Sequence, residues 1–350
     1  MARSTIGLDI GTSAVRAAQV KGKDPATLVG YAQLPLPPGS MRGGEIVDSD
    51  AVAGVIRDLW RRGEFRGKKV AVAVANPSVV VREVDVPRMD ESDLHGALRY
   101  QVQDYIPIAI EEALLDFLPL DEFVNADGVE MMRVLAVAAH RNMVSDFVGV
   151  LARAGLEPTA IDLGPLAAAR ALTDAVPAVL SDHECEAIVD IGAGVTGLVV
   201  HERGTPQFVR ILAEGGADLT DELAAALGVS VEDAEMRKMA SEAAPQGAPV
   251  EPGTPAAIER RVRAFIDDVR LSLEYYASER DRAPVRRVLL TGGGALLAGL
   301  QGRLSGALGV PVERGDALGR VKVADLGLGP EQLEQVSAVG AVAIGLALEP

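Results

Sequence analysis

Two short aspartate–glycine loops are the segments of this sequence best suited to chemistry. The first runs Asp9-Ile10-Gly11-Thr12-Ser13, and the second runs Asp190-Ile191-Gly192-Ala193-Gly194-Val195-Thr196. Each loop follows one apolar stretch and leads into another, which predicts a strand, a tight turn and a second strand. Two such loops in one chain indicate two related halves that close on one ligand from opposite sides.

The residue types in these loops favour phosphate and a divalent cation. Glycine turns aim backbone N–H groups at one point, where they can cradle phosphate oxygens. Asp9 and Asp190 would orient a magnesium ion through water, because Mg²⁺ keeps most of its hydration. The predicted phosphate contacts are the backbone at Gly11, Gly192 and Gly194 and the hydroxyls of Thr12, Ser13 and Thr196. The alternative for either loop alone is an ordinary turn between two strands.

Three further features could complete a nucleotide site. Gly292-Gly293-Gly294 follows an apolar strand, where glycine lets the backbone approach a base or a phosphate. Gly215-Gly216 precedes a helix. Glu235 and Lys238 are three residues apart on a predicted helix, so they share a face and could hold the adenosine end. The alternatives are a tight strand-to-helix turn for the glycines and a surface ion pair for Glu235 and Lys238.

The elements of the first half place the first loop at the end of a hairpin over residues 5–20. A third strand over 27–34, a helix over 50–62 capped by Ser49 or Asp50, and a buried parallel strand over 70–75 follow. A different unit follows, and its predicted elements are strands at 79–86, 113–120 and 131–139 and helices at 90–105 and 142–154. The chain then returns with a strand at 159–161 and a helix through Ala175.

The second half begins near Ala187 with the second loop. Predicted helices at 218–227 and 230–240 precede a proline- and glycine-rich loop at 243–256, and a long helix covers 258–280. A strand at 288–291 leads through the triple glycine into a helix at 296–308. The last helix, at about 335–348, contains Gly340 and Gly345, which allow a close helix crossing or a hinge.

Composition narrows the class of protein. A chain of 350 residues with 48% hydrophobic residues predicts a globular protein of two domains. The net charge of −16 and only 3% aromatic residues argue against nucleic-acid binding. Cys185 is the sole cysteine, so we expect neither a disulfide nor a cysteine metal site. We expect no signal peptide and no membrane span, and therefore a cytoplasmic protein.

Together and in this order, the motifs resemble the actin-like ATP-binding superfamily. The phosphate-1 motif matches Asp9 to Ser13, phosphate-2 matches Asp190 to Thr196, and the adenosine motif matches Gly292 to Gly294. The resemblance implies an α/β, actin-like (ribonuclease H-like) two-domain ATPase fold with an inserted strand-helix-strand-strand subdomain. The implied division is 1–78 for the first lobe (1A), 79–157 for the inserted subdomain (1C), 158–185 for the return to the first lobe, 186–217 and 286–338 for the second lobe (2A), 218–285 for subdomain 2B and 339–350 for a connecting helix.

Within that superfamily the sequence is similar to the PilM family of type IV pilus assembly proteins. The similarity rests on a helix that ends Tyr105-Ile106-Pro107, on Gly215 to Thr220 as a helix start, and on Ala234 to Lys238. It implies ATP and Mg²⁺ as cofactors and a cleft for the N-terminal peptide of a PilN-like membrane protein, at the strand 79–86 or the helix Leu94–Tyr105. Two departures are Gly194, where many members have a larger residue, and the proline-rich loop at 243–256.

The resemblance also implies an adaptor recruited to the inner face of the membrane, with pilus assembly ATPases or the platform as further partners and an oligomer possible. Hydrolysis would be slow or absent, and the catalytic residue is unknown; Asp162 is the nearest candidate for a general base, or a helix cap. The alternatives are a small-molecule kinase of the same fold and an FtsA-like filament protein. Against the filament protein, the chain ends at Leu348-Glu349-Pro350 without the amphipathic anchor typical of FtsA.

Overall fold

The computed structural model describes residues 4–23, 25–103, 105–173, 183–243, 254–279 and 282–348. Most of the predicted proline-rich loop, the end of the helix predicted through Ala175, Asp104, Arg280 and the final Glu349-Pro350 lie outside these ranges. Among the described residues, no helix is both long and apolar enough to cross a membrane.

The first half of the chain builds a six-stranded sheet of order β10-β6-β1-β2-β3-β16. Three strands form an antiparallel meander, and two more run parallel to the first of them. The strands are β1 (Ser4–Ile10), β2 (Ala14–Lys21), β3 (Thr27–Pro35), β6 (Lys69–Val74), β10 (Glu157–Leu163) and β16 (Lys322–Val323). The parallel pairing of β6 was predicted from its unbroken apolar run, which suits a strand buried on both faces.

The second half repeats this plan in a five-stranded sheet of order β13-β12-β11-β14-β15. Its first three strands again form an antiparallel meander, and the last two are parallel to the first. The strands are β11 (Cys185–Ile191), β12 (Thr196–Glu202), β13 (Thr205–Leu212), β14 (Val285–Thr291) and β15 (Val312–Arg314). The matching order of the two sheets supports the prediction of two related halves.

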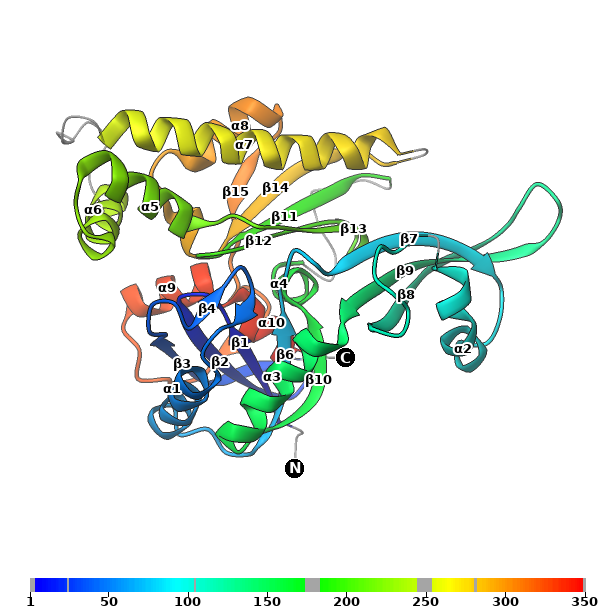
Figure 1. Ribbon diagram of the computed structural model, residues 1–350, viewed down its shortest axis with the longest axis horizontal. Helices are drawn as coiled ribbons and strands as arrows, with labels where there is room; N and C mark the ends of the chain where they lie inside the picture. The colour runs from blue at the N-terminus through cyan, green and yellow to red at the C-terminus, as the bar shows by residue number, and fades with distance from the viewer. Residues whose placement is uncertain are drawn as a thin grey trace.

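Helices surround both sheets, and α4 and α10 lie between them (Figure 1). On the first lobe, α1 (Ser49–Arg62) is capped by Asp48 rather than by the predicted Ser49 or Asp50. On the second lobe, α7 runs along the outer side of the sheet (Figure 1). The other helices are α3 (Arg141–Ala154), α4 (Gly164–Leu172), α5 (Gly216–Leu227), α6 (Val231–Ala243), α7 (Thr254–Ser278), α8 (Leu300–Leu308), α9 (Pro330–Val339), α10 (Ala341–Ala347) and the short 3₁₀ helix η1 (Gly293–Leu296).

A small sheet of order β7-β9-β8 projects from the first lobe, and its hairpin extends away from the rest of the molecule (Figure 1). It contains β7 (Val80–Pro87), β8 (Ala113–Val124) and β9 (Glu130–His140), with α2 (Glu91–Gln101) between the first two. We call residues 80–140, which contain these four elements, the insert. They share a separate apolar core that includes Val84, Leu94 and Val102. By contrast, α3, which the sequence grouped with this unit, packs against α1 and β10 of the first lobe.

Several element boundaries differ from the sequence prediction. The last helix is two helices, because the chain bends at Gly340, where an added Cβ would lie 2.6 Å from the Val336 oxygen. The helix predicted at 296–308 starts only at Leu300, after η1. The helix predicted to Tyr105 ends at Gln101. The strands β13, β15 and β16 and the short pair β4 (Met41–Arg42) and β5 (Glu45–Ile46) were not predicted.

Candidate nucleotide-binding site

The two aspartate–glycine loops have the same local geometry. Each aspartate is the second-last residue of a central strand, Asp9 in β1 and Asp190 in β11. Each following turn is closed by the same backbone hydrogen bond, from Gly11 N–H to the Ala14 oxygen and from Gly192 N–H to the Val195 oxygen, both 3.0 Å. The duplicated hairpins therefore present equivalent turns from the two halves of the chain.

These two turns meet across one cavity of about 320 Å³. A Cβ placed on Gly194 would lie only 2.7 Å from Oγ1 of Thr12, so the two loops are in close contact. The cavity is lined by both loops, by the glycines before α5 and after β14, and by side chains of α5, α6 and α7. The halves thus enclose a single space rather than two separate ones.

The polar end of the cavity holds two carboxylates and one guanidinium. Arg16 lies directly opposite Asp9 in the β1–β2 register, and its Nη1 donates to Asp9 Oδ2 at 3.2 Å. Its Nε donates to Gln33 Oε1 at 3.1 Å. Burial, and then the neighbouring charge of Asp9, raise the pKa of Asp190 to about 7. Burial also raises the pKa of Asp9, while Arg16 opposes that shift.

This end of the cavity suits a hydrated magnesium ion. Among the described residues, no group of three or more His, Cys, Asp or Glu side chains could hold a metal by protein ligands alone. Mg²⁺ commonly binds through one or two carboxylates, several waters and the phosphates of a nucleotide. The nearby charge of Asp9 contributes to the raised pKa of Asp190, and a divalent cation near both carboxylates would reduce this repulsion. The donor set therefore fits Mg²⁺ bound together with phosphate.

The triple glycine lies against the second loop. Gly292 has φ +85°, and a Cβ there would lie 2.5 Å from Asp190 Oδ1. Its N–H donates to the oxygen of Ala338 at 2.9 Å, which ties the turn to α9. Gly293 is different, because an added Cβ would meet no atom within 4 Å although the residue lines the cavity. Gly292 thus allows the close approach to Asp190, and Gly293 leaves space.

The opposite end of the cavity is largely apolar. Its walls come from α5, α6, α7 and the segment after β14, and they include Leu219, Met239, Val262, Phe265, Leu296, Leu297 and Leu300. Apolar walls with few polar groups are typical of pockets for a flat base. The cavity therefore combines a phosphate-like end with a base-like end.

Glu235 and Lys238 lie at this second end, but they form more than a surface ion pair. Lys238 is buried, and its Nζ contacts Glu235 Oε2 at 2.6 Å. It also donates to the Gly216 oxygen at 3.0 Å and to Thr220 Oγ1 at 2.8 Å. The predicted pair therefore joins α6 to the first turn of α5, beside the glycines that line the cavity.

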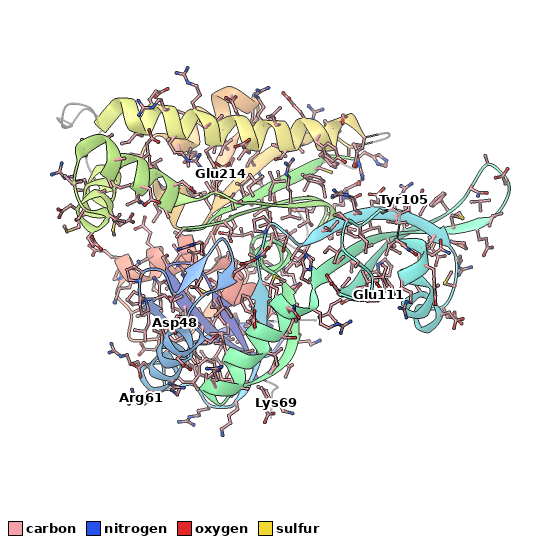
Figure 2. The ribbon with its side chains drawn as sticks, viewed as in Figure 1. Asp48, Arg61, Lys69, Tyr105, Glu111 and Glu214 are labelled. Carbon is pink, nitrogen blue, oxygen red and sulfur yellow. The ribbon has the colours of Figure 1, made fainter. Side chains whose placement is uncertain are left out.

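Arg261 of α7 is a cavity residue that sequence reasoning missed. Its Nη2 lies 2.6 Å from Oε2 of Glu214, which sits beneath α7 (Figure 2). Burial raises the pKa of Glu214 to about 7, against the opposing charge of Arg261. Within the part of the chain that the structure describes, the other oxygen, Glu214 Oε1, is buried without a hydrogen-bond partner, and the neighbouring Asp268 also raises the pKa of Glu214. Arg261 thereby connects α7 to the chain just before Gly215-Gly216.

The predicted site residues line the cavity with two exceptions, Gly194 and Thr196. Gly194 faces Thr12, as described above. Thr196 is fully buried, and its hydroxyl donates to the Glu214 backbone oxygen at 2.8 Å, so the geometry does not support its predicted contact with phosphate. Asp162, the candidate base, is paired with Arg170 and does not line the cavity; the cap of α4 is Leu163.

The cavity residues that were not predicted differ in whether a local sequence pattern could have identified them. Arg16 and Gln33 stand in cross-strand register with Asp9, so the predicted hairpin could have identified them. Arg261 and Phe265 reach the cavity only because α7 packs against α5. No local pattern in the sequence reports that contact.

Comparison with solved structures identifies the fold. MreB5 of Spiroplasma citri bound to AMPPNP matches 98% of this chain and 94% of its own, with TM-score 0.53 and 14% identity. The ethanolamine utilization protein EutJ from Carboxydothermus hydrogenoformans matches 99% of this chain and 89% of its own, with TM-score 0.59 and 18% identity. At these identities the likeness concerns the fold alone. The fold is that of the actin-like ATPases.

Sequence comparison is more specific. The family model for the type IV pilus assembly protein PilM matches residues 7–350, and the chain belongs to this family. A solved PilM–PilN type IV pilus biogenesis complex has a chain that is 30% identical, with 99% of both chains covered and TM-score 0.85. The cell division protein FtsA of Bacillus subtilis is 25% identical over 260 residues, 67% of this chain and 57% of that protein. The chain thus spans less than two thirds of that relative's length.

Proposed function

We propose that this chain binds ATP with Mg²⁺ in the cavity between its lobes and serves as an adaptor in type IV pilus assembly. The observation that carries the nucleotide part is the contact of two equivalent aspartate–glycine turns across a cavity with one polar and one apolar end. A phosphate chain fits the turns, and a base fits the apolar walls. The family membership supports the role in pilus assembly.

Different residues would bind the phosphates and the metal ion. The backbone at Gly11 and Gly192 and the hydroxyls of Thr12 and Ser13 would hold phosphate oxygens, and Asp9 and Asp190 would hold hydrated Mg²⁺. When bound, that ion neutralises phosphate charge. Arg16 supplies a further positive charge at the same end of the cavity. We assign no general base, so the chain would be at most a slow Mg²⁺-dependent ATPase.

The partner in this proposal is the N-terminal peptide of a PilN-like membrane protein. The PilM–PilN complex among the similar structures supports this choice. On the insert, β7 is an edge strand to which an extended peptide could add. Tyr100 and Tyr105 offer aromatic surface there, with exposed fractions of 74% and 56%; Tyr105 is labelled in Figure 2. Through this partner the chain would be held at the cytoplasmic face of the membrane, near pilus ATPases or the platform.

Calorimetric titration with ATP and Mg²⁺ tests the nucleotide part. The wild type should bind, whereas Asp190→Asn should lose most Mg²⁺-dependent affinity. Gly293→Val should fold normally but bind ATP weakly, because its side chain takes cavity space. The matched controls are Asp58→Asn, whose side chain is 46% exposed, and Gly302→Val, at an exposed position. Neither residue lines the cavity, so both variants should bind like the wild type. Equal binding by all four variants would contradict the assignment.

A second titration tests the partner. The same protein, with and without ATP, receives a synthetic peptide from the N-terminus of the neighbouring PilN-like protein. Binding that Tyr105→Ser weakens would support docking on the insert. ATP binding without peptide binding would contradict the adaptor proposal and favour the filament alternative, which sedimentation with ATP would then detect.

A further inference from the structure

The insert belongs to the first lobe by chain connection, yet it also contacts the second lobe. Strand β13 of the second sheet lies against β7 and β8 of the insert. Near this junction, Nη1 of Arg282 donates to Oε2 of Glu83 on β7 at 2.8 Å. The two residues are 199 positions apart and come from different lobes. This contact therefore joins parts of the molecule that the cleft divides.

Arg282 is held in place from its own side. Its Nε donates to Glu279 Oε2 at 2.8 Å, and its guanidinium lies 5.4 Å from the centre of the Tyr276 ring. The side chain is only 11% exposed, and that of Glu83 is 19% exposed. A charge pair that is largely shielded from water is weakened little by salt. Arg282 thus behaves as a fixed extension of the end of α7.

Glu83 is held from the other side. Its second oxygen, Oε1, forms an ion pair with Nε of Arg133 on β9 at 3.1 Å, and the Nε–H of Arg133 donates to Asp85 Oδ1 at 3.0 Å. Each oxygen of Glu83 therefore has its own guanidinium, one from the insert and one from the second lobe. If the second lobe moved relative to the insert, it would either break the contact between Arg282 and Glu83 or move the Glu83 side chain with it.

The helix that precedes Arg282 leads back to the nucleotide cavity. Its first turns contribute Arg261, Val262 and Phe265 to the cavity wall. From there α7 continues unbroken to Ser278, about 20 Å further along at 1.5 Å per residue. Near its end, the Tyr276 hydroxyl contacts Cys185 Sγ at 3.3 Å, and Cys185 begins the strand that carries Asp190. Figure 1 shows α7 running from α5 and α6 toward the insert.

We propose that Glu83 and Arg282 form a latch through which nucleotide in the cavity changes the position or mobility of the insert. Nucleotide would shift the second lobe, α7 would carry that shift to Arg282, and the ion pair would pass it to β7. Because coupling between two binding sites is reciprocal, a peptide on the insert would change ATP affinity by the same factor. The latch rests on the proposed function, since it links the two ligands named there.

The first test needs only ATP. Hydrogen–deuterium exchange of the full chain is compared with and without Mg²⁺ and ATP, at ATP concentrations set by calorimetry for each variant. In the wild type, ATP should change exchange in β7–β9, although no insert residue lines the cavity. Arg282→Gln should retain ATP affinity within about threefold but lose the change in β7–β9. Arg270→Gln is the matched control, because Arg270 forms ion pairs with Asp267 and Glu274 of the same helix.

The second test measures coupling with the PilN-like peptide. In the wild type, saturating ATP should change peptide affinity by a factor in the usual range of about 5 to 150. In Glu83→Gln and Arg282→Gln, the ratio of peptide affinity with ATP to that without ATP should lie within about twofold of one. The double variant should show no further loss of coupling than either single variant. Glu83→Gln also loosens Arg133, so Arg282→Gln is the cleaner of the two.

The outcomes distinguish failure of the latch from failure of the proposed function on which it rests. If ATP and peptide both bind but exchange in the insert does not respond to ATP, the latch is wrong and the proposed function stands. The same holds if Arg282→Gln keeps the full response or the full coupling factor. If calorimetry detects no ATP binding, the nucleotide part of the proposed function fails, and the latch fails with it.

Discussion

Asp190 combines a stability cost with a binding role. Its pKa of about 7 lies above that of an unfolded aspartate, near 3.9, so the folded protein binds the extra proton between those values. Without ligand, the contribution of Asp190 to the free energy of unfolding should therefore fall as pH rises from about 4 to 7 and then level off. We predict that Asp190→Asn raises the free energy of unfolding by about 1 to 3 kcal/mol at pH 8, and by little at pH 4.

Urea unfolding of both proteins at pH 4, 6 and 8 measures this difference. Glu214, whose pKa is also about 7, affects both proteins equally and cancels in the comparison. With Mg²⁺ and ATP present the order should reverse, because only the wild type gains stability from the ligand. A variant that is less stable than the wild type at pH 8 without ligand would contradict the assigned environment of Asp190.

Lys238 is the second residue whose role can be isolated. It is buried and holds α6 to the first turn of α5 through the Gly216 oxygen and Thr220. Lys238→Met would remove the donor of both hydrogen bonds and the positive charge beside Glu235. We therefore predict that the free energy of unfolding falls by about 1 to 3 kcal/mol. ATP affinity should also fall, because Gly216 lines the cavity. Thermal unfolding and ATP titration measure both, and Lys68→Met, at an exposed position away from the cavity, should change neither.

At the scale of elements, helices α10 and α4 cross in close contact between the two sheets. A Cβ on Gly345 would overlap the backbone oxygen of Ala167, so the helices can approach this closely only with glycine at the crossing. We predict that Gly345→Ala lowers the free energy of unfolding by about 2 to 4 kcal/mol, a cost typical of overpacking with backbone displacement. Gly149→Ala on α3 is the matched control, because a Cβ there meets no atom within 4 Å.

Chemical denaturation compares the two alanine variants. The control should gain about 0.5 to 1 kcal/mol, since alanine favours a helix more than glycine does. Opposite signs for the same substitution would show that packing at the crossing, and not helix propensity, decides the effect. A neutral Gly345→Ala would mean that α4 and α10 separate easily, as a hinge would require.

The elements also show what a sequence can predict here. The two hairpins and their turns were predictable, because turn chemistry and apolar runs act over a few residues. The actin-like fold and the PilM family were predicted from the order of the motifs, and the comparisons confirm both. The cavity wall from α7 was not predictable, because Arg261 and Phe265 reach it through packing between distant segments. The hydrogen bond from the buried Thr196 hydroxyl to the Glu214 backbone oxygen was not predictable either, because it joins segments 18 residues apart.

At the scale of the whole molecule, two similar sheets meet through their aspartate–glycine turns. The contact between Thr12 and Gly194 sets how closely the lobes approach, because an added Cβ on Gly194 would lie 2.7 Å from Thr12 Oγ1 and 2.8 Å from its Cγ2. Glycine here therefore permits a closer arrangement of the two lobes.

We predict that Gly194→Ala holds the lobes apart and weakens ATP binding about 10-fold, which corresponds to about 1.4 kcal/mol. Small-angle X-ray scattering with saturating ATP should give a larger radius of gyration for the variant than for the wild type. Because Gly194 does not line the cavity, lost contact with the ligand does not explain such a change. The effect would instead come from contact between the lobes.

A second substitution distinguishes this steric effect from general damage. Thr12→Ala removes Oγ1 and Cγ2, the two atoms nearest to the added Cβ, so Gly194→Ala combined with Thr12→Ala should regain the smaller radius. The double variant should still bind ATP more weakly than the wild type, because the Thr12 hydroxyl is one of the proposed phosphate contacts. Recovery of the radius without full recovery of affinity would assign the two functions of Thr12 separately. An unchanged radius in Gly194→Ala would mean that the turns do not limit closure.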